Sequence, residues 1–414
     1  MEKLAIYGGQ KVKTTPYGEG KRFGEAELNE LKEALDQNTL FYFTPAAKKV
    51  RKLTKTLAEI YGTNYCVATS SGTAAVHVAI GALGITAGDE VITTPITDMG
   101  TIIGILAQNA IPVFADVDPY TYNIDPKSVE KCITERTKAI IVVHLAGVPC
   151  DMDAIMDIAR RYNVKVIEDC CQAFMCKYKG QYVGTIGDVG CFSFNEFKHV
   201  VAGDGGAVLV NTEDMFYRCH RFADKEYDRH GTELRKIPLL APNYRMNELT
   251  ASCVLGQLTK ADFICGRHTQ IGDAITNGIK DLSGVSTYKI DESSTATYLW
   301  YMYRIDEKVL GVSRNEYVKA LQAEGISAGA GYIPECVYYY DMFQNKSAYK
   351  GTNCPFNCKY YDNDIEYPAG LAPVAEEVLK TAVRLPVSEF FTDEDVEQTV
   401  RAIRKVTEYF INNK

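Results

Sequence analysis

The stretch from residue 65 to residue 210 alternates short apolar runs with helical segments, and this alternation constrains the fold more than any other feature of the sequence. Apolar runs of strand length occur at residues 66–68, 91–93, 112–114, 138–143 and 164–167. Helical patterns that end near Leu83, Ala107 and Tyr162 lie between them. This order predicts an α/β fold, with a mixed, mostly parallel sheet flanked by helices. Ligands of such folds bind at the carboxyl ends of the strands.

Helical patterns also precede this region, at residues 25–37 and 46–61. The first pattern predicts an amphipathic helix whose apolar face holds Leu28, Leu31, Ala34 and Leu35. The aromatic turn at residues 41–45 separates the two patterns.

Beyond about residue 265 the chain changes character. We expect a helix, a strand near residues 298–305, a helix near 315–324 and a last helix that begins near Thr392. The 414 residues are enough for two domains. We therefore predict a large domain with an N-terminal helical segment at residues 1–262 and a smaller α+β domain at residues 263–414.

Charge and hydropathy exclude several classes of protein. The formal net charge of -8 argues against nucleic acid and membrane as partners, because both attract basic surfaces. No apolar run reaches the length of about 18 residues that a membrane-spanning helix needs. The first residues lack the apolar core and cleavage site of a signal peptide, so we expect a cytoplasmic protein.

The 13 cysteines are odd in number and irregularly spaced, which is typical of reduced, buried thiols. Cys354 and Cys358 stand in a polar loop without a second matching pair. We therefore predict no metal site.

Lys198 lies on a connection between two apolar runs, residues 191–194 and 207–210, just before the glycine-rich turn at 203–206. A partly buried lysine loses its proton more easily, which suits it to imine chemistry. Most lysines are simply exposed, so Lys198 needs partners elsewhere in the chain to support this interpretation.

Two other segments supply such partners. Residues 70–75, SSGTAA, close a strand and open a helix, which favours either an anion site at the free N–H groups or simple helix capping. Gly72 adds no side chain that would block an anion. Asp169 stands at the end of an apolar strand, after Val166 and Ile167, where it could pair with a protonated ring nitrogen or cap the next segment. Gln172 follows three residues later and could reach the same ring.

The order of an SGT turn, an Asp at a strand end and a later lysine between strands is the layout of a fold-type I enzyme that uses pyridoxal 5′-phosphate (PLP). The sequence also resembles the sugar aminotransferases of the DegT/DnrJ/EryC1/StrS family over nearly its whole length. The resemblance rests on SSGTAA, GDEVI, IPVFADVD, TKAIIVVHLAG, IEDCCQA, GDVGCFSF, NYRMNEL and LPV.

This resemblance implies a role for individual residues. Lys198 matches the lysine that binds PLP covalently as an aldimine and moves the proton in catalysis. Asp169 matches the partner of the pyridine nitrogen, and Gln172 matches the contact to the ring hydroxyl. The phosphate cradle matches Gly72, Thr73, Ala74 and Ser193. The resemblance further implies that Asn243 and Arg245 reach the phosphate of a neighbouring subunit, which predicts a homodimer with shared active sites.

The sequence departs from the family at one cofactor position. Relatives carry an aromatic residue that stacks on the ring, whereas this segment reads Thr97-Asp98-Met99-Gly100-Thr101 and places Asp98 there. Relatives that act as dehydratases have His in place of the lysine. This chain keeps Lys198, with His199 beside it, which favours transamination.

The predicted activity moves an amino group from glutamate or glutamine to a keto-sugar, expected to be nucleotide-linked, by a ping-pong mechanism. Three alternatives stay open: an aminotransferase for a cyclitol or another keto compound, a regulatory protein that binds PLP without turnover, and a non-catalytic scaffold that binds no PLP. Tyr332 and His199 are candidate substrate contacts. Arg229, His230 and Arg235 could bind a nucleotide diphosphate or form a solvated loop.

Overall fold

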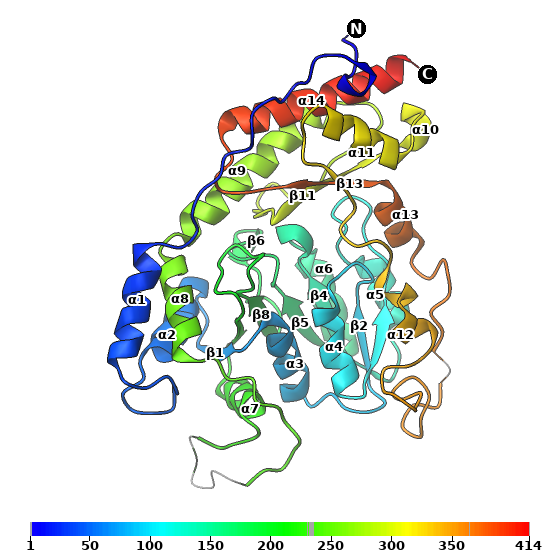
Figure 1. The fold of residues 1–414 in the computed structure, drawn as a ribbon. Coiled ribbons are helices and arrows are strands. Elements are labelled where there is room, and N and C mark those ends of the chain that lie inside the picture. The colour runs from blue at the N-terminus through cyan, green and yellow to red at the C-terminus, as the bar shows by residue number, and fades with distance from the viewer. Residues whose placement is uncertain (1, 230, 232–235, 364, 414) are drawn as a thin grey trace.

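A computed structural model describes residues 2–229, 231, 236–363 and 365–413 (Figure 1). Its centre is a seven-stranded sheet with the strand order β1-β9-β8-β5-β4-β2-β3. The strands are β1 (Tyr65–Thr69), β2 (Glu90–Thr93), β3 (Ile111–Phe114), β4 (Thr137–Val143), β5 (Lys165–Asp169), β8 (Val189–Ser193) and β9 (Gly206–Val210). Pairs from β3 to β8 are parallel, and β8–β9 and β9–β1 are antiparallel.

Helices cover both faces of this sheet, which confirms the predicted α/β class. Along β4, Ile140 and Val142 enter one core, and Ala139 and Ile141 enter the core of the opposite face. The first core includes side chains of α2 (Lys49–Tyr61), α5 (Pro126–Cys132), α6 (Met152–Tyr162) and α8 (Glu248–Leu258). The second includes side chains of α3 (Gly72–Ala82), α4 (Met99–Ala107) and α7 (Glu213–Ala223).

The C-terminal part of the chain forms a second, antiparallel sheet with the order β10-β11-β13-β12. Its strands are β10 (Val285–Ser286), β11 (Trp300–Ile305), β12 (Gly329–Ala330) and β13 (Ala382–Pro386). Its helices are α9 (Ala261–Ile279), α10 (Glu307–Leu310), α11 (Arg314–Ala323), α12 (Asp341–Gln344), α13 (Pro373–Thr381) and α14 (Asp393–Asn412). As predicted, Thr392 caps the last helix, since its Oγ1 accepts a hydrogen bond from the Asp395 N–H.

The N-terminal segment lies against these C-terminal elements, and both ends of the chain are close together in Figure 1. The N–H of Val12 donates to Glu324 at 3.0 Å, and Nζ of Lys13 lies 2.5 Å from Asp395. The segment then crosses to α1 (Glu25–Asp36) beside the large sheet. The predicted domain boundary at residue 262 stays a prediction.

The prediction of which side chains α1 buries is wrong in one respect. Leu28 and Leu35 are 57% and 62% exposed, whereas Glu27 and Ala34 are buried. The cause is the close packing of α1 on α8, where a Cβ at Gly256 would lie 2.7 Å from Cα of Glu27. The buried Glu27 carboxylate is neutralised by Lys260, 2.6 Å away.

None of the helices that the structure describes is both long and apolar enough to cross a membrane.

Candidate active site

A cavity of about 210 Å³ lies at the carboxyl ends of β5 and β8, beside the first turn of α3. This is the strand edge where the α/β pattern predicts a ligand. The described residues that line it are Ser71, Gly72, Thr73, Val76, Asp98, Gly100, Thr101, Asp169, Cys171, Gln172, Ser193, Asn195, Lys198 and Asp204. The structure therefore brings together seven of the residues singled out in the sequence: Gly72, Thr73, Asp98, Asp169, Gln172, Ser193 and Lys198.

The start of α3 offers an anion site. Ser71 caps the helix, and its Oγ accepts a hydrogen bond of 3.0 Å from the N–H of Ala74. Gly72 and Thr73 therefore supply the first N–H groups of the helix that have no partner within it. A Cβ at Gly72 would lie 2.6 Å from Cβ of Ser193, so only glycine allows α3 to approach β8 this closely.

Asp169 is fixed by two donors although only 4% of it is exposed. Oγ1 of Thr101 donates to Oδ2 at 2.7 Å, and the N–H of Cys171 donates to Oδ1 at 3.1 Å. Thr101 also lies 2.7 Å from the hydroxyl of Thr97. Sequence reasoning missed Thr101, and the signal that could have found it is the spacing of four residues between two threonines at a helix start.

Gln172 joins the cavity to the C-terminal part of the chain. Its Oε1 accepts a hydrogen bond of 2.8 Å from the N–H of Ala146, which fixes the amide so that Nε2 donates to the hydroxyl of Tyr332 at 3.2 Å. Burial, together with the charges of Asp98 and Asp169, raises the pKa of Tyr332 above its usual value. Tyr332 is therefore a neutral phenol at physiological pH.

Lys198 is half-buried on the connection between β8 and β9. Its own N–H donates to the carbonyl of Asn195 at 3.0 Å. Within the described chain no side chain or carbonyl accepts a hydrogen bond from Nζ, so the amine remains available for chemistry in the cavity.

His199 lies outside this cavity. It is 1% exposed, and its Nε2 pairs with the carbonyl of Thr297 at 2.9 Å. Burial, with a smaller effect of nearby His268, lowers the pKa of His199 to about 3. His199 is thus a neutral, buried group, and its suggested contact with substrate has no support from its position.

Asp98 caps α4 and is exposed, and its Oδ1 accepts a hydrogen bond of 2.8 Å from the N–H of Gly100. None of the described residues that line the cavity introduced above is aromatic. At this position the structure therefore has an exposed helix cap, and the expected departure from the relatives stays a prediction.

A second cavity, of about 730 Å³, adjoins the first and shares Asp98, Asn195 and Lys198 with it. Its wall includes the rings of Trp300 and Tyr332, which stack with centroids 4.6 Å apart. Arg384 also lines it, and its guanidinium has no hydrogen-bond or ion-pair partner among the described residues. The remaining lining residues are Phe197, Leu299, Ser327, Ala328, Gly329, Pro386 and Val387. Together the two cavities provide space for a cofactor and, beside it, a substrate.

Asn243 and Arg245 line neither cavity of their own chain. The backbone of Arg245 bridges to Thr69 of β1, and its guanidinium pairs with Asp224. Arg229 binds the same carboxylate at 2.7 Å. His230 and Arg235, the other cations considered for a nucleotide, lie outside the described residues.

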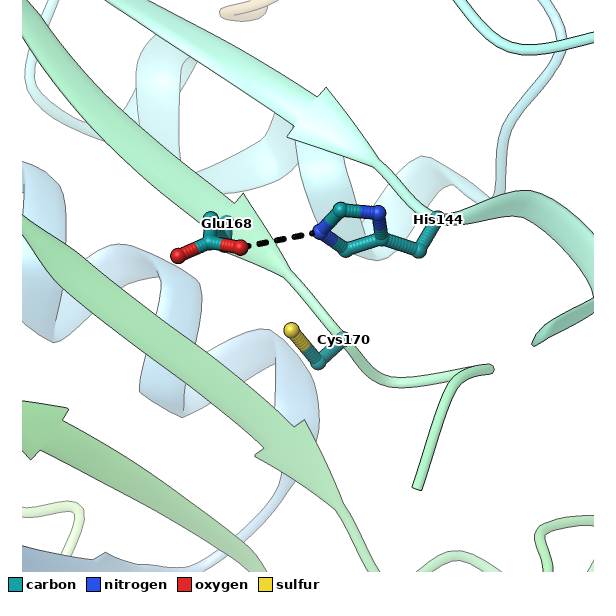
Figure 2. A group of neighbouring side chains, drawn as sticks. All are labelled: His144, Glu168 and Cys170. Atoms are coloured by element: carbon teal, nitrogen blue, oxygen red, sulfur yellow. Dashed lines mark hydrogen bonds and ion pairs between the residues drawn. The ribbon is translucent and has the colours of Figure 1, made fainter. Parts of the chain in front are cut away.

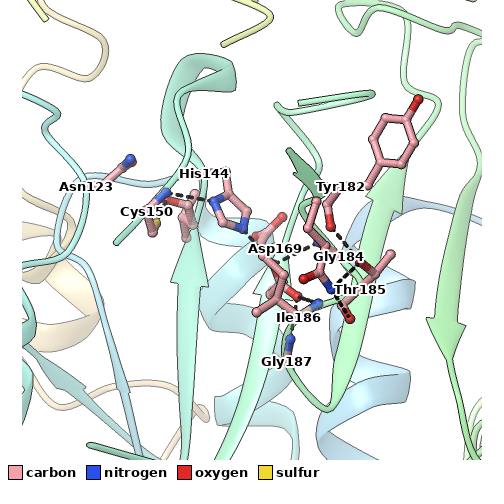
Figure 3. Close-up of polar contacts among 12 residues, drawn as sticks. Asn123, His144, Cys150, Asp169, Tyr182, Gly184, Thr185, Ile186 and Gly187 are labelled. Carbon is pink, nitrogen blue, oxygen red and sulfur yellow. Dashed lines mark hydrogen bonds and ion pairs between the residues drawn. The ribbon is translucent and has the colours of Figure 1, made fainter. Parts of the chain in front are cut away.

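Behind Asp169, the buried side chains of His144, Glu168 and Cys170 form a cluster (Figure 2). The Glu168 carboxylate accepts hydrogen bonds from the N–H groups of Gly184, Ile186 and Gly187, at 2.6 to 2.8 Å (Figure 3). Such a shell of donors compensates for the burial of a charge.

The His144 ring completes this network. Nδ1 accepts a hydrogen bond of 3.0 Å from the N–H of Cys150, so the proton resides on Nε2, which donates to Glu168 at 3.1 Å. Burial and the adjacent charge of Glu168 raise the pKa of the Cys170 thiol. His144, Glu168 and Cys170 are all residue types that can bind a metal ion. The hydrogen bonds of His144 and Glu168, however, form a network that fixes the end of β5, next to Asp169.

Comparison with known proteins agrees with this geometry. The profile of the DegT/DnrJ/EryC1/StrS aminotransferase family matches residues 21–359. A putative L-glutamine:3-amino-2,3-dideoxy-scyllo-inosose aminotransferase of Micromonospora echinospora is 33% identical over 98% of this chain and 97% of its own. GDP-perosamine synthase of Escherichia coli O157:H7 is 36% identical over 67% of this chain and 74% of its own.

Among solved structures, an aminotransferase from Psychrobacter cryohalolentis superposes with a TM-score of 0.82 at 30% identity. The superposition covers 96% of this chain and 100% of that protein. This likeness confirms the predicted fold class.

Proposed function

The chain belongs to the DegT/DnrJ/EryC1/StrS aminotransferase family, and on that premise we propose that it transfers an amino group from glutamine or glutamate to the keto carbon of a sugar or cyclitol. PLP is the proposed cofactor. The observation that carries this proposal is that the start of α3, Asp169 and Lys198 line one and the same cavity.

The residues of the smaller cavity fit PLP. The free N–H groups of Gly72 and Thr73, with the hydroxyl of Ser193, would hold its phosphate. The buried carboxylate of Asp169, oriented by Thr101, would pair with its protonated ring nitrogen. Bound PLP supplies an aldehyde carbon that condenses with amines and a ring that accepts electrons from the carbon being deprotonated.

The chain's own chemistry centres on Lys198. Its amine would attach the cofactor and, once the donor displaces it, would take the α-proton of the amino acid and deliver a proton to the former aldehyde carbon of the cofactor. Gln172 presents Nε2 as a donor, because its Oε1 already accepts a hydrogen bond from the N–H of Ala146. With donor and acceptor using the same site in turn, the kinetics are proposed to be ping-pong.

Two acceptor classes are candidates. The sequence favours a nucleotide-linked keto-sugar, and the relative named GDP-perosamine synthase supports this class. The larger cavity favours an unlinked keto-cyclitol, because its described lining offers stacked rings and one unpaired arginine, Arg384. A single arginine is better suited to bind the one α-carboxylate of the amino donor than to bind the two phosphates of a diphosphate. The relatives named as scyllo-inosose aminotransferases support this second class.

We further propose that the active protein is a homodimer. Asn243 and Arg245 stand at the β1 edge of the sheet, outside their own cavity, where a second copy could receive them. Leu28 and Leu35 on α1 are exposed apolar side chains that a second copy would cover.

The test is a panel of acceptors given to the purified protein with PLP and glutamine. scyllo-Inosose and a nucleotide-linked keto-sugar are compared by mass spectrometry of the amine product. Borohydride reduction and peptide mapping should find the cofactor on Lys198. Lys198→Ala should lower turnover by about 10⁴-fold or more, because a nucleophile and an acid–base group are lost together.

Lys198→Arg serves as the control that keeps the charge and length without a nucleophilic amine. Turnover by either variant close to that of the wild type would exclude the proposed role of Lys198. Product from neither acceptor class, in a protein that still converts glutamine, would exclude both proposed acceptors.

A further inference from the structure

The backbone of Lys198 is held by a side chain from a distant part of the sequence. Nη1 of Arg22 donates a hydrogen bond of 2.8 Å to the carbonyl oxygen of Lys198. The other edge of the same guanidinium donates to both carboxylate oxygens of Glu389, from Nε and Nη2, at 3.0 Å each. The planar fork of arginine thus joins two segments that lysine could not join in this geometry.

Glu389 is a fixed anchor for this arginine. It is 4% exposed, and Nε2 of His268 lies 3.5 Å from its Oε2. Although burial opposes ionisation, the hydrogen bonds from His268 and Arg22 hold the pKa of Glu389 at about 2. The carboxylate is therefore charged throughout the physiological range and keeps Arg22 in place.

Arg22 is also fixed at its own backbone. Its carbonyl oxygen accepts hydrogen bonds from Nε2 of Gln257, at 2.8 Å, and from Nζ of Lys260. Both ends of the bridge are consequently held by hydrogen bonds. One is anchored to α8 and the α8–α9 turn, and the other to the buried His268.

The bridge ends beside the larger cavity. Glu389 follows Pro386 and Val387, which line that cavity, whereas neither Arg22 nor Glu389 lines either cavity. Arg22 therefore links the wall of the substrate cavity to the peptide of Lys198 without touching the space that the ligands would fill.

We propose that Arg22 is a positioning residue that fixes the peptide of Lys198 relative to the segment 386–389, so that Nζ is presented to the reacting carbons in one place. This rests on the role of Lys198 given under Proposed function. A displacement of about 1 Å at a reacting group can lower a rate by about a hundredfold.

The experiment compares Arg22→Gln, Arg22→Lys and the control Arg267→Gln in the full chain loaded with PLP. Arg267 is a fair control because its side chain is 18% exposed, against 23% for Arg22, and it too donates to a backbone carbonyl, that of Phe391. It does not contact Lys198. Three quantities are measured: kcat, KM for the amino donor, and the pKa at which the absorbance of the bound cofactor changes.

Arg22→Gln should lower kcat by about ten- to a hundredfold, leave the donor KM near the wild-type value and displace the pKa of the chromophore. Arg22→Lys should recover little of the kcat lost in Arg22→Gln, because an ammonium group cannot donate to both the Lys198 carbonyl and the two Glu389 oxygens as the planar guanidinium does. Arg267→Gln should match the wild type in all three quantities. If Arg22→Gln fails to fold by circular dichroism, Glu389→Gln, which keeps the shape and removes the charge, carries the same expectation.

A kcat and a chromophore pKa in Arg22→Gln that equal the wild-type values would overturn the proposal, as would equal losses in Arg22→Gln and Arg267→Gln. Borohydride trapping separates the two levels of inference. If the wild type carries no cofactor on Lys198, the proposed function fails. If the wild type is trapped on Lys198 and Arg22→Gln behaves identically in every measurement, only the positioning role fails.

Discussion

At the scale of single residues, Asp98 occupies the position where the resemblance described in the sequence analysis leads us to expect an aromatic ring. An aromatic ring at this position would cover a cofactor, but the Asp98 carboxylate instead closes the first turn of α4 through Gly100. Removing such a cap costs about 1 kcal/mol of stability. The aromatic side chains of Trp300 and Tyr332 line the larger cavity, which Asp98 lines as well.

Arg384 carries a prediction at the same scale. Because its guanidinium has no partner in the part of the chain that the structure describes and lines the larger cavity, it is expected to bind the α-carboxylate of the amino donor. Arg384→Gln should therefore raise the KM for the donor by about ten- to a hundredfold, in line with the loss of a hydrogen bond to a charged group. The KM for the acceptor and the affinity for PLP should stay unchanged.

The control for this prediction is Arg304→Gln, because Arg304 is on the neighbouring strand β11 and bonds Thr381 instead of facing a ligand. Steady-state kinetics with each substrate varied in turn makes the measurement. A rise in the acceptor KM alone would assign Arg384 to the acceptor, and with it to a phosphate-bearing substrate.

At the scale of elements, the N-terminal segment is tied to α14 by a buried ion pair between Lys13 and Asp395. Burial opposes ionisation, but hydrogen bonds from Lys13, Gly18 and Thr392 lower the pKa of Asp395 from 3.8 to about 2. Because the folded pKa is depressed, the stabilisation is complete above the unfolded pKa and disappears as the pH falls toward 2. Its size is about 2 kcal/mol.

Asp395→Asn should therefore lower the Tm at neutral pH and flatten the decline of Tm between about pH 4 and pH 2. Glu394→Gln, in the same first turn but exposed, is the matched control and should leave the acid limb unchanged. Differential scanning calorimetry across that range makes the measurement. An acid limb in Asp395→Asn as steep as that of the wild type would contradict the assigned linkage.

The sequence predicts elements better than it predicts their partners. The helix at residues 152–162 and the start of α14 at Thr392 agree with the structure because periodicity and capping are local signals. Leu28 and Leu35 share a helical face as predicted, yet which face packs on α8 depends on Gly256, more than 200 residues away.

The same distinction holds within the candidate site. Lys198, Asp169 and Gly72 can be found from motifs because each sits at a recognisable strand end or helix start. The spacing from Thr97 is the one local signal for Thr101, and Arg22 has none, since both roles exist only once distant segments meet at Asp169 and at the carbonyl of Lys198.

At the scale of the whole molecule, the exposed side chains of α1 predict association. Leu28→Asp combined with Leu35→Asp should convert the proposed dimer into monomers, because two charges would be buried without partners at the contact. Light scattering after size-exclusion chromatography measures the mass. The affinity for PLP should fall with it, if Asn243 and Arg245 of one copy complete the cradle of the other.

Tyr360→Asp is the control for this pair, since Tyr360 is 56% exposed and lies on the segment after α12, which Figure 1 shows at the opposite side from α1. A variant at Leu28 and Leu35 that keeps the wild-type mass would show that α1 is not at the contact.

The bridge through Arg22 also bears on how the protein is made. Arg22 and Glu389 are 367 residues apart, so at about 5–20 residues per second a ribosome needs on the order of half a minute between them. During about the second half of that interval the nascent chain contains Lys198 but not yet the carboxylate that anchors its arginine. The lysine therefore reaches the setting that we propose for it only after residue 389 has been synthesised, and we expect cofactor loading to follow that point.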